Sequence, residues 1–359
     1  MKYPPLQYHD YLKLDQILNS QFLKSEEYQR KAHDEMLFIV VHQAYELWFK
    51  QILWELKTVQ EIFSQSNIPE RDMGLAGQRL HRVKEILRLI LGQIDVLETM
   101  TALDFLDFRE FLYPASGFQS FQFRQIEILL GLRVESRSVL NNTPFQKQLK
   151  SEQGSQAEQL MNEKSLFDLM EAWLARMPLL ETSNFSFWEE YKKCALQMLN
   201  EDLETIRTNP LLSEAEKVKN SEGMKKSFMP FESLFDENKF KELQAQNYFR
   251  MNLKSVKSAL MILLYRDEPL FQTPFKMISH LLDIDELMTQ WRYRHALMAH
   301  RMLGKKIGTG GSSGSEYLKE ATEKHKVFTD LFNLSTFLLP RSKIPQLPES
   351  VRTKMNFQY

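Results

Sequence analysis

Apolar side chains recur along this chain with the period of an α-helix. Between residues 33 and 65 the chain has neither glycine nor proline. The apolar stripe of this stretch, at spacings of 4, 3 and 4 residues, consists of Phe38, His42, Tyr45 and Phe49. Such spacing places side chains on one face of a helix with 3.6 residues per turn. Residues 79–98 and 118–132 repeat the pattern, so we predict a bundle of long helices.

Glycine and proline are scarce in the chain as a whole. Only 12 glycines and 13 prolines stand among 359 residues, whereas a β-sheet needs turn residues about every ten positions. We therefore predict an all-α fold. Residues 141–163 and 208–226 are rich in polar side chains, which is typical of exposed connections. The expected parts are an N-terminal segment (1–30), a helical core (31–135 and 235–345), a smaller helical subdomain with these polar excursions (136–234) and a C-terminal tail (346–359).

The charged side chains nearly balance. The chain carries 46 basic and 47 acidic residues, a net charge of −1, which provides no electrostatic attraction to nucleic acid or to an anionic membrane. It begins without the apolar stretch of a signal peptide and has no run of about 18 apolar residues. The single cysteine, Cys194, is typical of a reducing compartment. We therefore expect a cytoplasmic protein that acts on small molecules or binds proteins.

Glycine is concentrated in one place. Five of the twelve glycines lie between residues 304 and 314, in the sequence GKKIGTGGSSG. This sequence matches neither the phosphate loop nor the dinucleotide-binding fingerprint. Its backbone can approach a ligand closely, and Thr309, Ser312 and Ser313 add hydroxyl groups that suit a carboxylate or a carbonyl. A flexible Gly/Ser linker is the alternative interpretation.

The histidines bear on metal binding. No pair among the eight has the i, i+4 spacing with which one helix face holds a metal ion, and none follows a glutamate by three residues. Non-haem centres are therefore disfavoured, whereas haem iron needs only one protein imidazole. His295 and His300 share a predicted helix but lie roughly 140° apart around it, so they cannot face the same iron. The stripe around His295, on which a flat porphyrin could lie, consists of Met288, Trp291, Met298 and Met302. The alternative is that His295 and His42 are ordinary core histidines.

Arg109 stands in an aromatic stretch, LDFLDFREFLYPASGF, among Phe105, Phe108 and Phe111. An arginine in apolar surroundings is typical of a pocket that binds a carboxylate, because its planar guanidinium donates two parallel hydrogen bonds. An internal ion pair is equally compatible with the local sequence. The candidate partners for such a pair are Asp104, Asp107 and Glu110.

Four stretches in collinear order resemble the tryptophan 2,3-dioxygenase family: HDEMLFIVVHQAYELWFKQILWEL, ETMTALDFLDFREFLYPASGFQSFQFRQIE, DIDELMTQWRYRHALMAHRMLGKKIGTGGSSG and KVFTDLFNLSTFLLPR. The resemblance extends over roughly residues 8–345. It implies an all-α homotetramer whose helices enclose a haem b pocket. It also implies that the ferrous enzyme converts L-tryptophan and dioxygen to N-formylkynurenine.

The resemblance assigns roles to single residues. His295 matches the residue that ligates the haem iron, and Ser116 matches a residue near the haem. His42 matches the distal histidine that accepts a hydrogen bond from the indole N–H. Arg109 matches the residue that binds the substrate carboxylate, and Thr309 the residue that closes over the amino-acid end. The implied apolar walls of the substrate pocket are Phe38, Phe105 and Leu112.

The N-terminal segment has an implied role in assembly. Tyr8, Tyr11 and Leu12 resemble residues that reach into a neighbouring subunit's pocket, so segment 1–30 would complete the site of another subunit. Tyr113, just before PASG, departs from the family pattern and puts only local packing in doubt.

Two alternative functions stay open at this point. One is a haem dioxygenase of the same fold that acts on another indole, and the other is a helical haem sensor without catalysis. His42, Arg109 and Thr309 favour an enzyme for a carboxylate-bearing indole, because a sensor has no physical need for all three.

Overall fold

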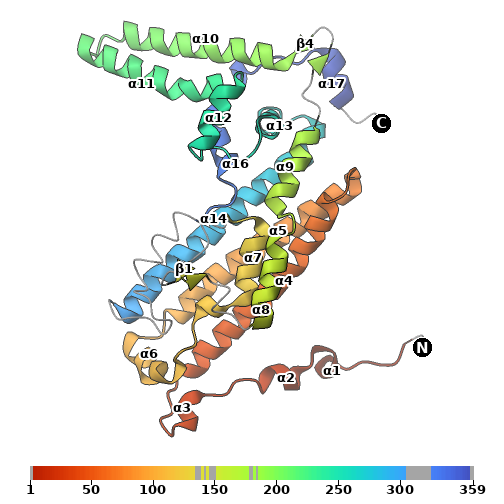
Figure 1. Cartoon of the computed structure of the whole chain (residues 1–359), viewed down its shortest axis with the longest axis vertical. Helices are drawn as coiled ribbons and strands as arrows, with labels where there is room; N and C mark the ends of the chain where they lie inside the picture. Colours follow the sequence, from red (N-terminus) through yellow and green to blue (C-terminus); the bar gives the residue numbers. More distant parts are fainter. Residues whose placement is uncertain are drawn as a thin grey trace. The chain divides into compact units, whose positions relative to one another are not determined.

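The computed structural model describes residues 3–133, 139–140, 143–144, 151–177, 181–182, 185–304 and 325–355, and most of this part is helical (Figure 1). The strands in these ranges are two short antiparallel pairs, β1 (Val139–Leu140) with β2 (Thr143–Pro144) and β3 (Glu181–Thr182) with β4 (Phe185–Ser186). The prediction of an all-α fold is confirmed. Within the same ranges, no helix combines the length and the apolar character that a membrane crossing requires.

The chain forms two compact units. Unit 1 contains Met1–Trp54, Glu85–Glu163 and Leu287–His325, and unit 2 contains Glu55–Lys84, Lys164–Glu286 and Lys326–Tyr359. Three long helices contribute residues to both units, namely α4 (Glu35–Phe63), α5 (Glu70–Leu97) and α14 (Pro269–Leu303).

The predicted helices are present, with one changed boundary. α4 fits the stretch predicted at 33–65, whereas α5 begins before residue 79 because the helix accommodates Gly74 and Gly77 in its interior. The third predicted stretch contains α7 (Phe121–Leu130). The side chain of Ser120 caps its first turn, and Gly131 ends it with a φ of 106°, in the left-handed region that favours glycine.

Unit 1 contains further short helices. They are α1 (Tyr8–Leu12), α2 (Leu14–Leu18), α3 (Lys24–Glu27), α6 (Ala102–Arg109), η1 (Glu110–Leu112), η2 (Gly117–Gln119) and α8 (Ser151–Met161). α8 lies within the stretch predicted to be exposed at 141–163, and its fully buried Ala157 packs with Ile128 of α7. This stretch is therefore partly helical, although most of its described side chains are exposed. A few small or apolar side chains at helical spacing are enough to bury one face.

Unit 2 contains the remaining helices. They are α9 (Leu166–Arg176), α10 (Phe187–Thr208), α11 (Glu214–Ser233), α12 (Glu237–Ala245), α13 (Leu253–Leu264), α16 (Thr329–Asn333), η5 (Leu334–Phe337), η6 (Arg341–Lys343) and α17 (Glu349–Met355). α10 and α11 lie side by side as an antiparallel pair (Figure 1). α11 starts after its N-cap Ser213, so the stretch predicted as a connection at 208–226 is partly helical, although most of its side chains are exposed.

The N-terminal segment buries little of its own surface. Neither α1 nor α2 has a buried residue, and Tyr8 and Tyr11 are 74% and 69% exposed. Further along the segment, Ser20 and Gln21 hydrogen-bond to Gln43 of α4 in the helical core. At α3, the buried carboxylate of Glu35 accepts hydrogen bonds from the backbone N–H groups of Lys24 (2.8 Å) and Ser25 (3.0 Å). Exposed apolar surface of this extent is typical of a region that another chain covers.

Candidate functional site

The structure places His295 on the apolar side of α14. The three methionines of the stripe predicted around it are buried, with exposed fractions of 2%, 9% and 8% for Met288, Met298 and Met302, and Trp291 is half-buried. His295 itself is half-buried, and the Trp291 ring stacks on its imidazole with a centroid distance of 5.3 Å and an interplanar angle of 3°. His300, on the same helix, is exposed. The two histidines therefore have different surroundings, as the helical spacing predicts.

His295 is neutral at physiological pH. Burial lowers the pKa of His295 to about 4, and repulsion from nearby His42 in its protonated form adds to this shift. A neutral imidazole keeps the nitrogen lone pair that a metal ligand needs. Among the described residues, no three His, Cys, Asp or Glu side chains gather around a common point to hold a metal ion. An isolated imidazole in apolar surroundings fits haem, because the macrocycle supplies the equatorial ligands.

α4 fixes the tautomer of His42. The Nδ1 atom lies 2.7 Å from the backbone carbonyl oxygen of Phe38, one turn earlier. Because a carbonyl oxygen can only accept, Nδ1 carries the proton and Nε2 keeps a lone pair. Burial lowers the pKa of His42 below its ordinary value of 6.5, although the hydrogen bond with Phe38 and the charge of Glu46 oppose the shift. His42 is therefore a neutral hydrogen-bond acceptor through Nε2.

Aromatic rings connect the two histidines. The Tyr45 ring lies edge-on to His42 at a centroid distance of 6.4 Å and to Trp291 at 6.0 Å, and Trp291 stacks on His295. The Tyr45 hydroxyl donates a hydrogen bond to the carbonyl of Ile90 at 3.1 Å, and burial raises the pKa of this hydroxyl to about 12. His42 and His295 thus border the same apolar region of unit 1.

α6 brings two further aromatic rings to this region. The rings of Phe105 and Phe108 lie 5.8 and 5.5 Å from that of Phe38. Arg109 follows in the last turn of the same helix and is half-buried. Phe38 is also the hydrogen-bond partner of His42. The helix α6 therefore carries both Arg109 and two rings that pack on Phe38.

Two of the three carboxylates considered as partners of Arg109 have other partners. Asp104 forms a capping box with Thr101 at the start of α6, and the hydrogen bonds from Thr101 hold the pKa of Asp104 below its ordinary value. Glu110 forms an ion pair with Arg30. These two carboxylates therefore stabilise the ends of α6.

The other predicted site residues have varied positions. Leu112 in η1 and Ser116 just after it are half-buried, and the N–H of Ser116 donates to Oε1 of Gln119 at 3.3 Å. Leu12 is half-buried on α1, next to the exposed Tyr11. Thr309 lies outside the described residues.

Some supporting residues were not predicted. The ring of Phe123 in α7 lies 5.0 Å from that of Trp291. Glu46, one turn after His42, accepts hydrogen bonds from the hydroxyl of Ser120 (2.6 Å) and the amide of Gln122 (2.7 Å), which join α4 to the start of α7. The apolar period of residues 118–132 indicates that Phe123 is buried, but no local pattern shows which distant ring it contacts.

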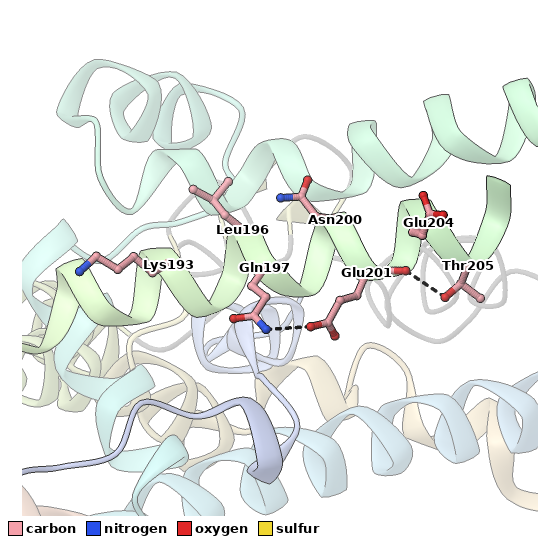
Figure 2. A pocket seen from close by; sticks show the side chains of 7 residues that line it. All are labelled: Lys193, Leu196, Gln197, Asn200, Glu201, Glu204 and Thr205. Carbon is pink, nitrogen blue, oxygen red and sulfur yellow. Dashed lines mark hydrogen bonds between the residues drawn. The ribbon is translucent and has the colours of Figure 1, made fainter. Parts of the chain in front are cut away.

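A groove of about 750 Å³ along α10 in unit 2 is a poorer candidate (Figure 2). It is lined by exposed side chains of this one helix: Lys193, Leu196, Gln197, Asn200, Glu201, Glu204 and Thr205. The amide of Gln197 and the hydroxyl of Thr205 both donate hydrogen bonds of 2.9 Å to Glu201, to its carboxylate and its backbone carbonyl respectively. Small-molecule sites are typically enclosed and largely apolar, so we interpret this groove as a solvated helix face.

Comparison with known proteins yields one family. The model of the family described as tryptophan 2,3-dioxygenase matches residues 3–338. A tryptophan 2,3-dioxygenase of Bdellovibrio bacteriovorus is 54% identical over 359 residues, which is 100% of both chains. The enzyme of that name from Alteromonas mediterranea is 47% identical, over 98% of each chain. The one from Xenopus tropicalis is also 47% identical, over 96% of this chain and 85% of its own.

Proposed function

Because the chain belongs to the tryptophan 2,3-dioxygenase family, we propose that it inserts both atoms of dioxygen across the indole 2,3 double bond of L-tryptophan. The product is N-formylkynurenine. This reaction is the first step of tryptophan catabolism through kynurenine, and we propose that it takes place in the cytoplasm. The observation that carries this proposal is the pair of neutral imidazoles, His42 and His295, beside one group of aromatic rings in unit 1.

His295 is the residue proposed to hold the iron of haem b. Its neutral nitrogen supplies the bond to iron, and the parallel ring of Trp291 restricts rotation of the imidazole. Ser116 is the proposed polar contact of the haem. When bound, ferrous haem supplies the iron that activates dioxygen.

The remaining residues bind and orient the substrate. Nε2 of His42 accepts the indole N–H, and the rings of Phe38 and Phe105, with Leu112, confine the indole. The guanidinium of Arg109 binds the carboxylate through two parallel hydrogen bonds. Thr309 contacts the amino-acid end. Holding the reacting groups in register is the main contribution of these side chains to the rate.

A substrate comparison tests this proposal. The haem-loaded, reduced protein is given L-tryptophan, tryptamine or indole, while dioxygen uptake and N-formylkynurenine are measured. We expect uptake and product with L-tryptophan and much less turnover with the two compounds that lack a carboxylate. Faster turnover of another indole would identify a related dioxygenase instead. Oxygen binding without any product would identify a haem sensor.

His42 predicts a particular pH dependence. The pKa of His42 lies below 6.5. Turnover at low substrate concentration should therefore be constant above pH 6.5 and decrease as the pH falls through this lowered pKa, because the imidazolium has no lone pair to accept the indole N–H. His42→Gln, which accepts but does not titrate, should remove this acid limb. His42→Ala should cost about 0.5–1.5 kcal/mol of transition-state stabilisation at neutral pH. An acid limb that is the same in His42→Gln would assign the titration to another group.

We also propose a homotetramer in which segment 1–30 reaches a neighbouring subunit's site. The exposed rings of Tyr8 and Tyr11, on a helix without buried residues, support it. Replacing both with serine should weaken association by about 2 kcal/mol or more and raise the KM for L-tryptophan. Light scattering and steady-state kinetics measure both effects. Leu211→Ser, at a position that is 89% exposed in unit 2, is the control and should change neither; a tetramer with unchanged KM in the double variant would refute the role.

A further inference from the structure

A buried ion-pair cluster lies in unit 1 beside Phe123, whose ring contacts that of Trp291. Glu127 of α7 is 2% exposed, and its two carboxylate oxygens have separate partners. Oε2 accepts a hydrogen bond of 2.7 Å from Arg124, and Oε1 accepts one of 2.9 Å from Arg292 of α14. Both arginines are 6% exposed. The second guanidinium nitrogen of Arg292 donates to the carbonyl of His325 at 3.0 Å.

The cluster is charged despite its burial. Burial alone would raise the pKa of the Glu127 carboxyl, but Arg124, His325 and Arg292 hold it below its ordinary value of 4.5. A pair of opposite charges away from water has strict geometric requirements, because each charge depends on its partner for the interactions that water no longer supplies. The contact between Glu127 and Arg292 therefore constrains α14 more tightly than apolar packing alone.

The rings of Phe123 and Trp291 lie between this cluster and the imidazole of His295. The guanidinium groups of Arg124 and Arg292 lie 5.8 and 5.9 Å from the centre of the Phe123 ring. The Phe123 ring lies 5.0 Å from that of Trp291, and Trp291 stacks on His295 at 5.3 Å. Arg292 also precedes His295 by three residues on α14, so the two project from neighbouring positions on the helix surface.

We infer that Arg292 is a positioning residue for the iron ligand, because its ion pair with Glu127 fixes the rotation of α14 and with it the plane of the His295 imidazole. This inference rests on the proposed function, in which His295 ligates the haem. Arg292 acts through Trp291 and the helix backbone, and it contacts neither the proposed substrate nor the iron.

The chain offers a matched control in unit 2. Glu55 of α4 is a carboxylate with 1% side-chain exposure, and Arg82 and Arg79 of α5 bind it at 2.8 and 3.3 Å. Arg82→Met therefore removes one of two arginines from a buried carboxylate, as Arg292→Met does from Glu127. Neither Arg82 nor Glu55 belongs to the ring contacts between Phe123, Trp291 and His295 described above.

The test compares Arg292→Met with Arg82→Met in the haem-loaded protein. The vibrational frequency of the iron–imidazole bond in the ferrous state and the rate of haem transfer to apomyoglobin are measured. In Arg292→Met we expect a shifted or broadened band and haem transfer about 10–100-fold faster, as for other residues that orient metal ligands. In Arg82→Met both should match the unmodified protein. The same band and transfer rate in all three proteins would overturn the inference.

Two further variants keep the test decisive. Should Arg292→Met fail to fold, Arg292→Lys retains the charge without the planar fork and should shift the band by a smaller amount; an unshifted band in the folded Lys variant overturns the inference. His295→Ala separates this inference from the proposed function. If that variant retains haem with the same band, His295 is not the ligand. If it loses the band while Arg292→Met leaves the band of His295 unchanged, only the positioning role fails.

Discussion

The His295→Ala protein should be purified without the absorption band of haem and should form no N-formylkynurenine from L-tryptophan. The reason is that His295 is a neutral imidazole on a stripe with three buried methionines, whereas the other histidine of that part of α14 is exposed. Absorption spectra and haem extraction measure the loss. Of all the changes considered, this one should have the largest effect, because it removes the protein's bond to iron.

His300→Ala is the control for this experiment. It removes an imidazole from the same helix at an exposed position, and it should leave haem content and turnover unchanged. Retention of haem by His295→Ala together with its loss from His300→Ala would reverse the assignment of the ligand. Circular dichroism of both variants should give the same helix content as the unmodified chain, which separates loss of haem from unfolding.

Arg109→Ala should weaken the binding of L-tryptophan by about 1.5–3 kcal/mol, the range for a hydrogen bond to a charged group. This corresponds to an increase in dissociation constant of about tenfold to 150-fold. Tryptamine lacks the carboxylate, so its affinity should hardly change in the same variant. Titration of the haem band with each compound gives both constants.

The neighbouring Arg30→Ala serves as the comparison for Arg109→Ala. Arg30 is an arginine with 62% side-chain exposure that pairs with Glu110, and its loss should have a much smaller effect on L-tryptophan affinity. Arg109→Lys should recover only part of the affinity, because an ammonium lacks the planar fork. An unchanged affinity for L-tryptophan in Arg109→Ala would remove this residue from the site.

Local periodicity was sufficient to predict the helices and the different surroundings of His295 and His300. Local periodicity did not predict α8. The contact of this helix with α7 depends on the small Ala157, which lies in a stretch of mostly polar residues. The start of α5 was also misplaced, because Gly74 and Gly77 lower helix propensity without ending a helix that tertiary packing stabilises.

The supporting residues of the site could not be predicted in the same way. The ion pair of Glu127 with Arg292 and the contact of Phe123 with Trp291 join residues that are far apart in the sequence. Nothing in the neighbourhood of either residue specifies its partner, since a charged side chain within an apolar helix is compatible with several partners. For Arg109, local sequence offered three acidic partners, and only the fold showed that Asp104 caps α6 and that Glu110 pairs with Arg30.

The hydrogen bond between His42 and the carbonyl of Phe38 has a consequence for ligand discrimination. While that bond holds the proton on Nδ1, Nε2 on the opposite side of the ring can only accept a hydrogen bond. A tryptophan analogue methylated on its ring nitrogen would bring a methyl group to this point, and that group donates no hydrogen bond. The backbone of α4, through the tautomer of His42 that it imposes, would thus give two ligands that differ by a single methyl group different affinities.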